Sequence, residues 1–272
     1  MTRAFVFSGG ASHGALQVGM VDALADHGIV PDLVTGTSVG AINGGWLAGG
    51  GDAAGLADIW RGLERDDVFP TNLMRGLRAF TGRKPSYFSD EGLRTLLAEH
   101  LLFERLENTV LPITVIATDE MTGEEVRLTE GDAVDAIVAS ASIPALLPPV
   151  EIGGRRLVDG AVVNNTPISV AIEAGATEVW VLTTGFGCPL ETPPGNAFAA
   201  ALHAVGLMVQ RRLVLELANA DYPVPVHIVP VPCPVDVSPI DFSQSEMMID
   251  RARDETQRWL AAGAPASIDT GG

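Results

Sequence analysis

The chain has 272 residues, of which 47% are hydrophobic and 19% are charged, so it can bury a sizeable core as a globular protein. Acidic residues outnumber basic residues by 34 to 17, which gives a formal net charge of -17. A surface of this sign repels phosphate backbones and excludes nucleic acid as a partner. Any contact with a membrane surface is therefore expected to be apolar and transient rather than electrostatic.

Predicted strands and helices alternate along the chain. A strand at residues 3–8, a helix at 14–27, a short strand at 33–35 and a helix at 39–47 form a βαβα start, which favours a parallel sheet. Residues 66–89 contain scattered Pro and Gly and predict an irregular cap. Further strands are expected at 109–119, 124–130, 156–158, 178–185 and 224–231, and further helices at 53–64, 90–100, 133–140, 197–220 and 243–262, with another beginning near residue 167.

These elements predict a single domain over residues 1–262, followed by a disordered tail of small residues at 263–272. No targeting segment is expected, because the first apolar run at residues 4–7 is far shorter than a signal-peptide core. Cys188 and Cys233 are too few for a disulfide framework and lack the spacing of metal ligands. We therefore expect both cysteines to be inert, and the protein to be cytoplasmic, in a reducing compartment.

Residues 36–40, "GTSVG", match the G-x-S-x-G pattern of a nucleophile elbow. The predicted helix begins just after Ser38, so its free N–H groups and dipole favour negative charge developing at that serine. The alternative is an ordinary turn of small residues. The position of the motif between the apolar residues 31–35 and a helix of small residues favours Ser38 as a nucleophile.

The stretch "SGGASHG", residues 8–14, joins the first strand to the first helix. A serine that transfers acyl groups needs backbone N–H donors for the oxyanion, and a glycine-rich turn supplies them. The candidate donors are Gly9, Gly10, Ala11 and Ser12. The alternative is a phosphate cradle in a nucleotide-binding module, although the loop lacks the G-K-[ST] and G-x-G-x-x-G patterns.

Two residues are candidates for the base. Ser38 follows a single βα unit, whereas ordinary α/β-hydrolases place several strands before the nucleophile and a histidine late in the chain. His227 is the late histidine that could complete such a triad. Asp159 stands where a strand breaks at Asp-Gly, which allows close approach to a neighbouring loop. The alternative for Asp159 is an Asp-Gly hairpin turn.

Four ordered blocks, "FSGGASHGALQVG", "GTSVGAINGG", "ASIPALLPPV" and "VDGAVVNNTPI", resemble the signature of the patatin-like phospholipase family from about residue 3 to beyond residue 170. The resemblance implies a three-layer α/β/α fold with a mostly parallel central sheet. It also implies a lipid acyl hydrolase with Ser38 as nucleophile, Asp159 as its partner and the glycine-rich loop as oxyanion hole, without a cofactor or metal. A carboxylate is a weak base at its usual pKa, so we expect desolvation to raise the pKa of Asp159.

The chain departs from the family pattern G-G-G-x-[RK]-G at two positions. Ala11 replaces a glycine and restricts φ, and His13 replaces the usual cation with a mostly neutral group. A catalytically weakened lipid-binding or regulatory protein of the same fold is therefore the alternative function. Residues 142–153 are apolar and proline-rich, and either line an acyl channel or form ordinary core between two strands.

Overall fold

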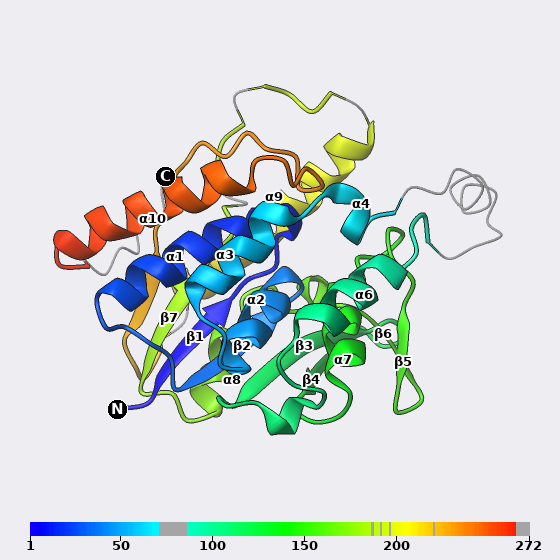
Figure 1. The fold of residues 1–272 in the computed structure, drawn as a ribbon, viewed down its shortest axis with the longest axis horizontal. Coiled ribbons are helices and arrows are strands. Elements are labelled where there is room, and N and C mark those ends of the chain that lie inside the picture. Colours follow the sequence, from blue (N-terminus) through cyan, green and yellow to red (C-terminus); the bar gives the residue numbers. More distant parts are fainter. Residues whose placement is uncertain (71–85, 186–187, 191, 196, 220, 265–272) are drawn as a thin grey trace.

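A mixed sheet of eight strands forms the middle layer of the molecule, with helices on both faces (Figure 1). The computed structural model describes residues 1–70, 86–185, 188–190, 192–195, 197–219 and 221–264. Within them the strand order is β5-β6-β3-β2-β1-β7-β8, and β4 also pairs with β3. The parallel strands are β1 (Arg3–Phe7), β2 (Leu33–Thr37), β3 (Ile113–Asp119), β7 (Glu178–Leu182) and β8 (Val226–Val229), whereas β4 (Glu125–Leu128), β5 (Val150–Ile152) and β6 (Arg155–Asp159) are antiparallel to their neighbours.

The strand sequence fixes which side chains enter each of the two cores. Phe5 and Phe7 of β1 point into the larger core, whereas Ala4 and Val6 point to the opposite face of the sheet. Both faces are apolar because helices cover both, as in other parallel sheets. The helices are α1 (Gly14–Asp26), α2 (Val39–Ala48), α3 (Ala53–Gly62), α4 (Arg65–Val68), α6 (Glu91–His100), α7 (Ala133–Ala141), α8 (Ile168–Glu173), α9 (Ala197–Asn219) and α10 (Ser245–Ala261), and short 3-10 helices are η1 (Ala11–His13), η2 (Leu106–Asn108) and η3 (Gly160–Val162).

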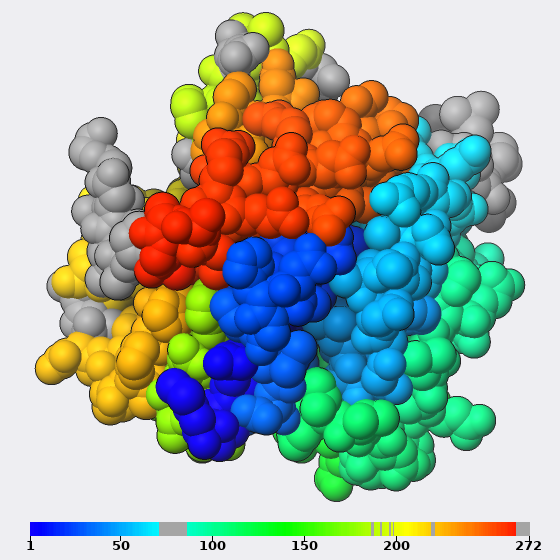
Figure 2. Space-filling view, turned by 60° about the vertical axis from the view of Figure 1, so that its left-hand side comes forward, coloured from blue at the N-terminus to red at the C-terminus, as the bar shows by residue number. Residues whose placement is uncertain are grey.

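Helices α1 and α10 lie side by side over the larger core (Figures 1 and 2). They approach closely at Gly19, where a Cβ atom would lie 2.0 Å from the backbone oxygen of Ile249. A residue larger than glycine would force the two helices apart. This contact holds α10 against α1, the helix that begins where the glycine-rich loop ends.

Strand register brings three loops to one edge of the sheet. Phe7 at the end of β1 is level with Gly36 of β2 and Leu182 of β7, so the segments after these strands leave the sheet together. On the other side, Thr37 pairs with Ile116, and the next residue of β3, Ala117, pairs with Asp159. Ser38 and Asp159 therefore lie at the same level of the sheet, on either side of β3.

The predicted three-layer fold is confirmed, and the predicted strands and helices outside the cap lie within a few residues of the observed ones. Helix α4 and strand β5 were not predicted. Most of the predicted irregular cap, residues 71–85, and the predicted tail from residue 265 lie outside the described residues. None of the helices that the structure describes is both long and apolar enough to span a membrane.

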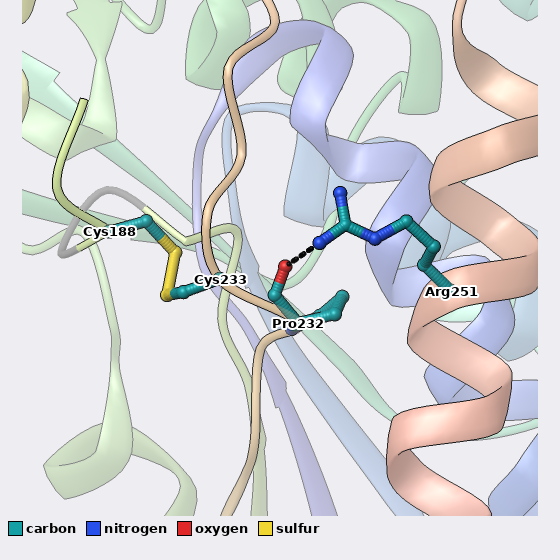
Figure 3. Close-up of a disulfide and its surroundings, with 4 residues drawn as sticks. All are labelled: Cys188, Pro232, Cys233 and Arg251. Atoms are coloured by element: carbon teal, nitrogen blue, oxygen red, sulfur yellow. Dashed lines mark hydrogen bonds between the residues drawn. A yellow bond between two sulfur atoms is a disulfide. The ribbon is translucent and has the colours of Figure 1, made fainter. Parts of the chain in front are cut away.

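The prediction of two inert cysteines in a reducing compartment is wrong in one respect, because Cys188 and Cys233 form a disulfide (Figure 3). Their separation of 45 residues gave no sign of pairing. The cause is sheet topology: Cys188 follows β7, Cys233 follows β8, and these strands are parallel neighbours that end level with each other at Leu182 and Val229. The two segments leave the sheet side by side, and the cysteine Cα atoms lie 5.3 Å apart.

Candidate active site

Ser38 forms the sharp turn between β2 and α2 that the G-x-S-x-G pattern predicts. Its φ of 57° and ψ of -127° are uncommon for a residue with a side chain, as at a strained nucleophile elbow. The flanking glycines are required sterically: a Cβ atom on Gly36 would lie 2.5 Å from the oxygen of Gly40, and one on Gly40 would lie 2.3 Å from the oxygen of Phe7. The Ser38 N–H donates to Ser140 Oγ over 2.8 Å, which fixes the turn against α7.

The Ser38 hydroxyl donates a hydrogen bond to Asp159 Oδ2 over 2.7 Å. The other carboxylate oxygen, Oδ1, accepts from the N–H of Ala161 over 2.8 Å, so the carboxylate is held in place. Both side chains are largely buried, with 5% of Ser38 and 3% of Asp159 exposed. The structure thus brings together the two residues predicted as nucleophile and base.

The Asp-Gly hairpin turn considered for Asp159 does not occur. β6 ends at Asp159, and the chain continues from Gly160 into the 3-10 helix η3. A Cβ atom on Gly160 would lie 2.3 Å from the oxygen of Ile116 and 3.0 Å from Cγ2 of Thr37. Glycine at this position therefore allows the close approach that places Asp159 next to the elbow.

Burial raises the pKa of Asp159 to about 6, because a charged carboxylate is poorly solvated there. The hydrogen bonds from Ala161 and Ser38 oppose this effect by favouring the charged form. The predicted increase is confirmed. A carboxyl group with this pKa is ionised at neutral pH and is a stronger base than an ordinary aspartate.

The four predicted oxyanion donors differ in their hydrogen bonds. The N–H of Gly9 donates to the oxygen of Asn165 over 3.3 Å, and the N–H of Ser12 donates to the oxygen of Pro239 over 2.9 Å. Among the described residues, the N–H groups of Gly10 and Ala11 have no acceptor. The donors left for an oxyanion are therefore those of Gly10 and Ala11.

The loop lies directly against the elbow, since a Cβ atom on Gly9 would be 3.0 Å from Cβ of Ser38. Ala11 has a φ of 49°, so it adopts the left-handed conformation that a glycine would adopt more easily. His13 is buried, which lowers its pKa, and its Nε2 lies 2.7 Å from the oxygen of Val237. A neutral ring that donates to this carbonyl thus occupies the position of the family's usual cation.

Two apolar pockets meet at Ser38 and Ala11. The first extends between α2, α3, α6 and α7 and is lined by residues such as Ile42, Trp60 and Leu97. The second also contains Asp159 and runs beneath α9. The strip at residues 142–153 contributes to both pockets through Ile143, so it borders the site, although its last part forms β5.

His227 lies away from this site. It belongs to β8, which is three strands from β2 in the sheet, a separation of about 14 Å. Its ring stacks on Trp180, with the ring centres 4.4 Å apart, and its Nε2 lies 3.4 Å from Oε1 of Glu178. These contacts account for the histidine without a role at Ser38.

Comparison with protein families gives a match to the patatin-like phospholipase model over residues 5–172. The patatin-like phospholipase domain-containing protein 7 of Rattus norvegicus is 31% identical over 185 residues, which are 67% of this chain and 13% of that protein. An uncharacterized NTE family protein of Mycobacterium tuberculosis is 30% identical over 204 residues, which are 70% of this chain and 33% of that protein. The chain thus spans a third or less of the length of these relatives.

Solved structures with similar folds include VipD from Legionella pneumophila, with a TM-score of 0.54 at 14% identity, covering 96% of this chain and 67% of that one. Human GIVD cytosolic phospholipase A2 gives a TM-score of 0.52 at 11% identity and covers 97% of this chain and 59% of that one. At these identities the likeness supports the fold alone. The family match over residues 5–172, together with the relative that is 31% identical over 67% of this chain, shows that the chain belongs to the patatin-like phospholipase family.

Proposed function

We propose that the chain is a serine lipid acyl hydrolase that cleaves carboxylic esters of phospholipids, lysophospholipids or related acyl esters. The observation that carries the proposal is the 2.7 Å hydrogen bond from Ser38 Oγ to Asp159 Oδ2 at the junction of two apolar pockets. Relatives support the same chemistry: the protein of Mycosarcoma maydis named lysophospholipase NTE1 is 27% identical over 68% of this chain and 10% of its own length.

In the first step, Asp159 takes the hydroxyl proton while Ser38 Oγ attacks the ester carbonyl carbon. The N–H groups of Gly10 and Ala11 stabilise the oxyanion, since they lie in the loop beside Ser38 and have no acceptor in the part of the chain that the structure describes. The tetrahedral intermediate then collapses, the alcohol leaves with the proton held by Asp159, and an acyl group stays on Ser38. In the second step, water gives a proton to Asp159 as its oxygen attacks the acyl carbon, and the N–H groups of the loop again face the oxyanion. When this intermediate collapses, Asp159 returns the proton to Ser38 Oγ and the fatty acid is released.

The first pocket is the proposed site of the acyl chain. Its lining is almost entirely hydrophobic, and it begins at Ser38 and Ala11, where the carbonyl group must lie. Burial of each CH₂ group contributes about 0.8 kcal/mol, so burial of an acyl chain in this pocket supplies a large part of the binding free energy. The second pocket, which contains Asp159, is left for the alcohol portion of the ester.

Activity is expected to rise with pH through the pKa of Asp159. The protonated carboxyl cannot accept the serine proton, so kcat/KM should increase about tenfold per pH unit below about pH 6 and level off above it. The measurement is kcat/KM for a p-nitrophenyl ester between pH 4.5 and pH 9. A His227→Gln variant serves as control, because its kcat/KM should rise with pH in the same way if no imidazole titrates in the reaction. If this rise disappears in the variant, the histidine-dependent triad is favoured instead.

We propose that helix α9 makes the transient, apolar contact with a lipid surface. Its first part, residues 197–209, carries no Asp, Glu, Lys or Arg. Val205 lines the second pocket and is half exposed, while Leu207 and Met208 next to it are 50% and 65% exposed. Exposed apolar side chains on a helix that lines a proposed lipid site are suited to the interface of a bilayer. Because the net charge is -17, we propose neutral or zwitterionic lipid as the preferred surface.

A double Leu207→Ser and Met208→Ser variant is expected to lower hydrolysis of lipid presented in phosphatidylcholine vesicles by about tenfold, because two apolar side chains no longer enter the interface. Hydrolysis of a soluble short-chain ester should stay within twofold of the unsubstituted protein. Initial rates on both substrates test this. Equal losses on the two substrates would mean that the helix supports the site itself and does not bind lipid surfaces.

Labelling with a fluorophosphonate probe tests the proposed function as a whole. The probe reacts with an activated serine, and peptide mass spectrometry should place it on Ser38. Incubation of the purified protein with a mixture of phospholipids, lysophospholipids and acylglycerols, followed by analysis of the released fatty acids, would identify the substrate class. A protein that binds these lipids but neither reacts with the probe nor releases fatty acid would be the catalytically weakened alternative.

A further inference from the structure

The glycine-rich loop is held from two sides by segments that follow neighbouring strands. On one side, Thr184 after β7 donates a hydrogen bond from Oγ1 to the oxygen of Gly9 over 2.6 Å. Thr184 is also the close neighbour of Gly10, where a Cβ atom would lie 2.2 Å from Thr184 Oγ1. This contact fixes the beginning of the loop.

On the other side, residues 237–239, which follow β8, present three consecutive carbonyl groups to the end of the loop. The oxygen of Pro239 accepts from the N–H of Ser12 over 2.9 Å, and the oxygen of Ser238 accepts from Ser12 Oγ over 3.0 Å. The oxygen of Val237 lies 2.7 Å from Nε2 of His13. Gly10 and Ala11 lie between the two anchored ends, so the direction of their N–H groups depends on both.

The disulfide joins the two anchoring segments. Cys188 lies four residues after Thr184, and Cys233 lies four residues before Val237. Next to Cys233, the oxygen of Pro232 accepts from Nη2 of Arg251 in α10 over 2.7 Å (Figure 3). The described residues between β7 and α9, and between β8 and α10, form neither helix nor strand, so the disulfide is a covalent restraint on otherwise irregular chain.

We propose that the Cys188–Cys233 disulfide is a positioning element for acyl transfer: it fixes the anchors that aim the N–H groups of Gly10 and Ala11 at the oxyanion. This inference rests on the proposed function. Opening the bond restores freedom to both segments, so the loop samples positions in which the donors are misaligned. A misplacement of about 1 Å in catalytic groups can cost up to about a hundredfold in rate.

The expected effect is on turnover rather than on substrate binding. Neither cysteine lines the apolar pocket proposed for the acyl chain, whereas both anchors contact the oxyanion loop. A double Cys188→Ser and Cys233→Ser variant is expected to show kcat lowered by roughly tenfold, with KM for a p-nitrophenyl octanoate substrate within twofold. The pH dependence should be unchanged, because Asp159 is not among the anchored residues.

The same result is expected when the unsubstituted protein is treated with tris(2-carboxyethyl)phosphine. The phosphine gives two electrons to the disulfide, the S–S bond breaks, each sulfur takes a proton from water, and the phosphorus retains the oxygen as phosphine oxide. The reductant should lower kcat to the level of the double variant and leave the double variant itself unaffected. Removal of the reductant and reoxidation should restore the original kcat.

A matched control separates positioning from a general loss of stability. Leu24 is fully buried near the end of α1, about 15 Å along the helix from the glycine-rich loop, so Leu24→Ala lowers thermal stability without touching the anchors. This control should keep its kcat at a temperature where both variants are folded. A decrease in kcat equal to that of the double variant would overturn the proposal, as would an unchanged kcat in the double variant.

Hydrogen–deuterium exchange provides a readout that does not require enzyme activity. The amide of Ser12, which donates to Pro239, should exchange at least tenfold faster in the double variant than in the unsubstituted protein or in Leu24→Ala. Unchanged exchange in the peptide that covers residues 8–19 would overturn the positioning role. If exchange is faster in the double variant but the unsubstituted protein hydrolyses no ester, the disulfide does restrain the loop and the proposed function is rejected.

Discussion

A Ser38→Ala variant is expected to lose ester hydrolysis by at least about 10⁴-fold, because no acyl-enzyme can form without the hydroxyl oxygen. The fold should be retained. Alanine carries the same Cβ as serine, so the substitution adds no backbone strain at the positive φ of the elbow, and it removes the hydroxyl's hydrogen bond to Asp159. The measurements are kcat/KM for p-nitrophenyl octanoate and the thermal unfolding temperature of the same preparation.

Ser142→Ala is a matched control for this variant. Ser142 is also a buried serine near the site, and its backbone oxygen accepts from the N–H of Asp159 over 2.9 Å. Its hydroxyl donates to the oxygen of Val138 in α7, so alanine removes a buried hydroxyl and keeps the backbone contact with Asp159. Its activity should stay within a few-fold of the unsubstituted protein. Retained activity in Ser38→Ala would reject Ser38 as the nucleophile, and an equal loss in Ser142→Ala would mean that removal of any buried hydroxyl near the site has this effect.

The elements that could be predicted from sequence are those whose burial and boundaries follow from their own residues. The apolar runs of β1, β2 and β7 end at glycine or at turns, so their positions follow from the sequence. β5 has three residues and was missed, although Gly153 and Gly154, both with positive φ, form the two-residue turn that joins it to β6. A Gly-Gly pair between short apolar segments is a hairpin signal that could have revealed it.

In the candidate site, too, some residues could be predicted from local sequence and others could not. Ser38 and Asp159 stand in motifs whose glycines are demanded by backbone contacts at those same positions, so local sequence carries the information. The partners of the oxyanion loop do not follow from local sequence. Residues 237–239 and the disulfide reach the loop only because β7 and β8 are parallel neighbours, and β8 follows β7 by more than 40 residues. The predicted strand–helix–strand order of residues 178–231 is compatible with parallel pairing of β7 and β8, but it does not place residues 237–239 or the two cysteines beside the glycine-rich loop.

An Asp159→Asn variant is expected to combine the loss of activity with a gain in stability. Asparagine keeps the shape of the side chain, and its amide oxygen can still accept from the N–H of Ala161, but it cannot take the serine proton. Turnover should therefore fall by about 10³-fold or more. A merely structural aspartate, by contrast, would lose stability and activity together when its charge is removed.

The gain in stability follows from the sign of the pKa change. In the unfolded chain Asp159 loses its proton near pH 4, whereas in the folded protein it keeps the proton until about pH 6. The folded state therefore binds more protons between these values, and the free energy of unfolding falls by roughly 3 kcal/mol as the pH rises through this range. Asparagine stays neutral, so the variant does not lose this part of the free energy of unfolding as the pH rises.

Thermal unfolding of the Asp159→Asn variant at two pH values tests both parts of the argument. At pH 8 its Tm should exceed that of the unsubstituted protein by about 5 °C, whereas at pH 4, where the folded aspartate is already protonated, the two should agree. Near-normal turnover in the variant would remove Asp159 as the base. Lost turnover with an equal or lower Tm at pH 8 would mean that the carboxylate is not desolvated, and a base with an ordinary aspartate pKa would then have to activate Ser38. Lost turnover with a higher Tm at pH 8 is the result expected if burial both activates the base and destabilises the fold.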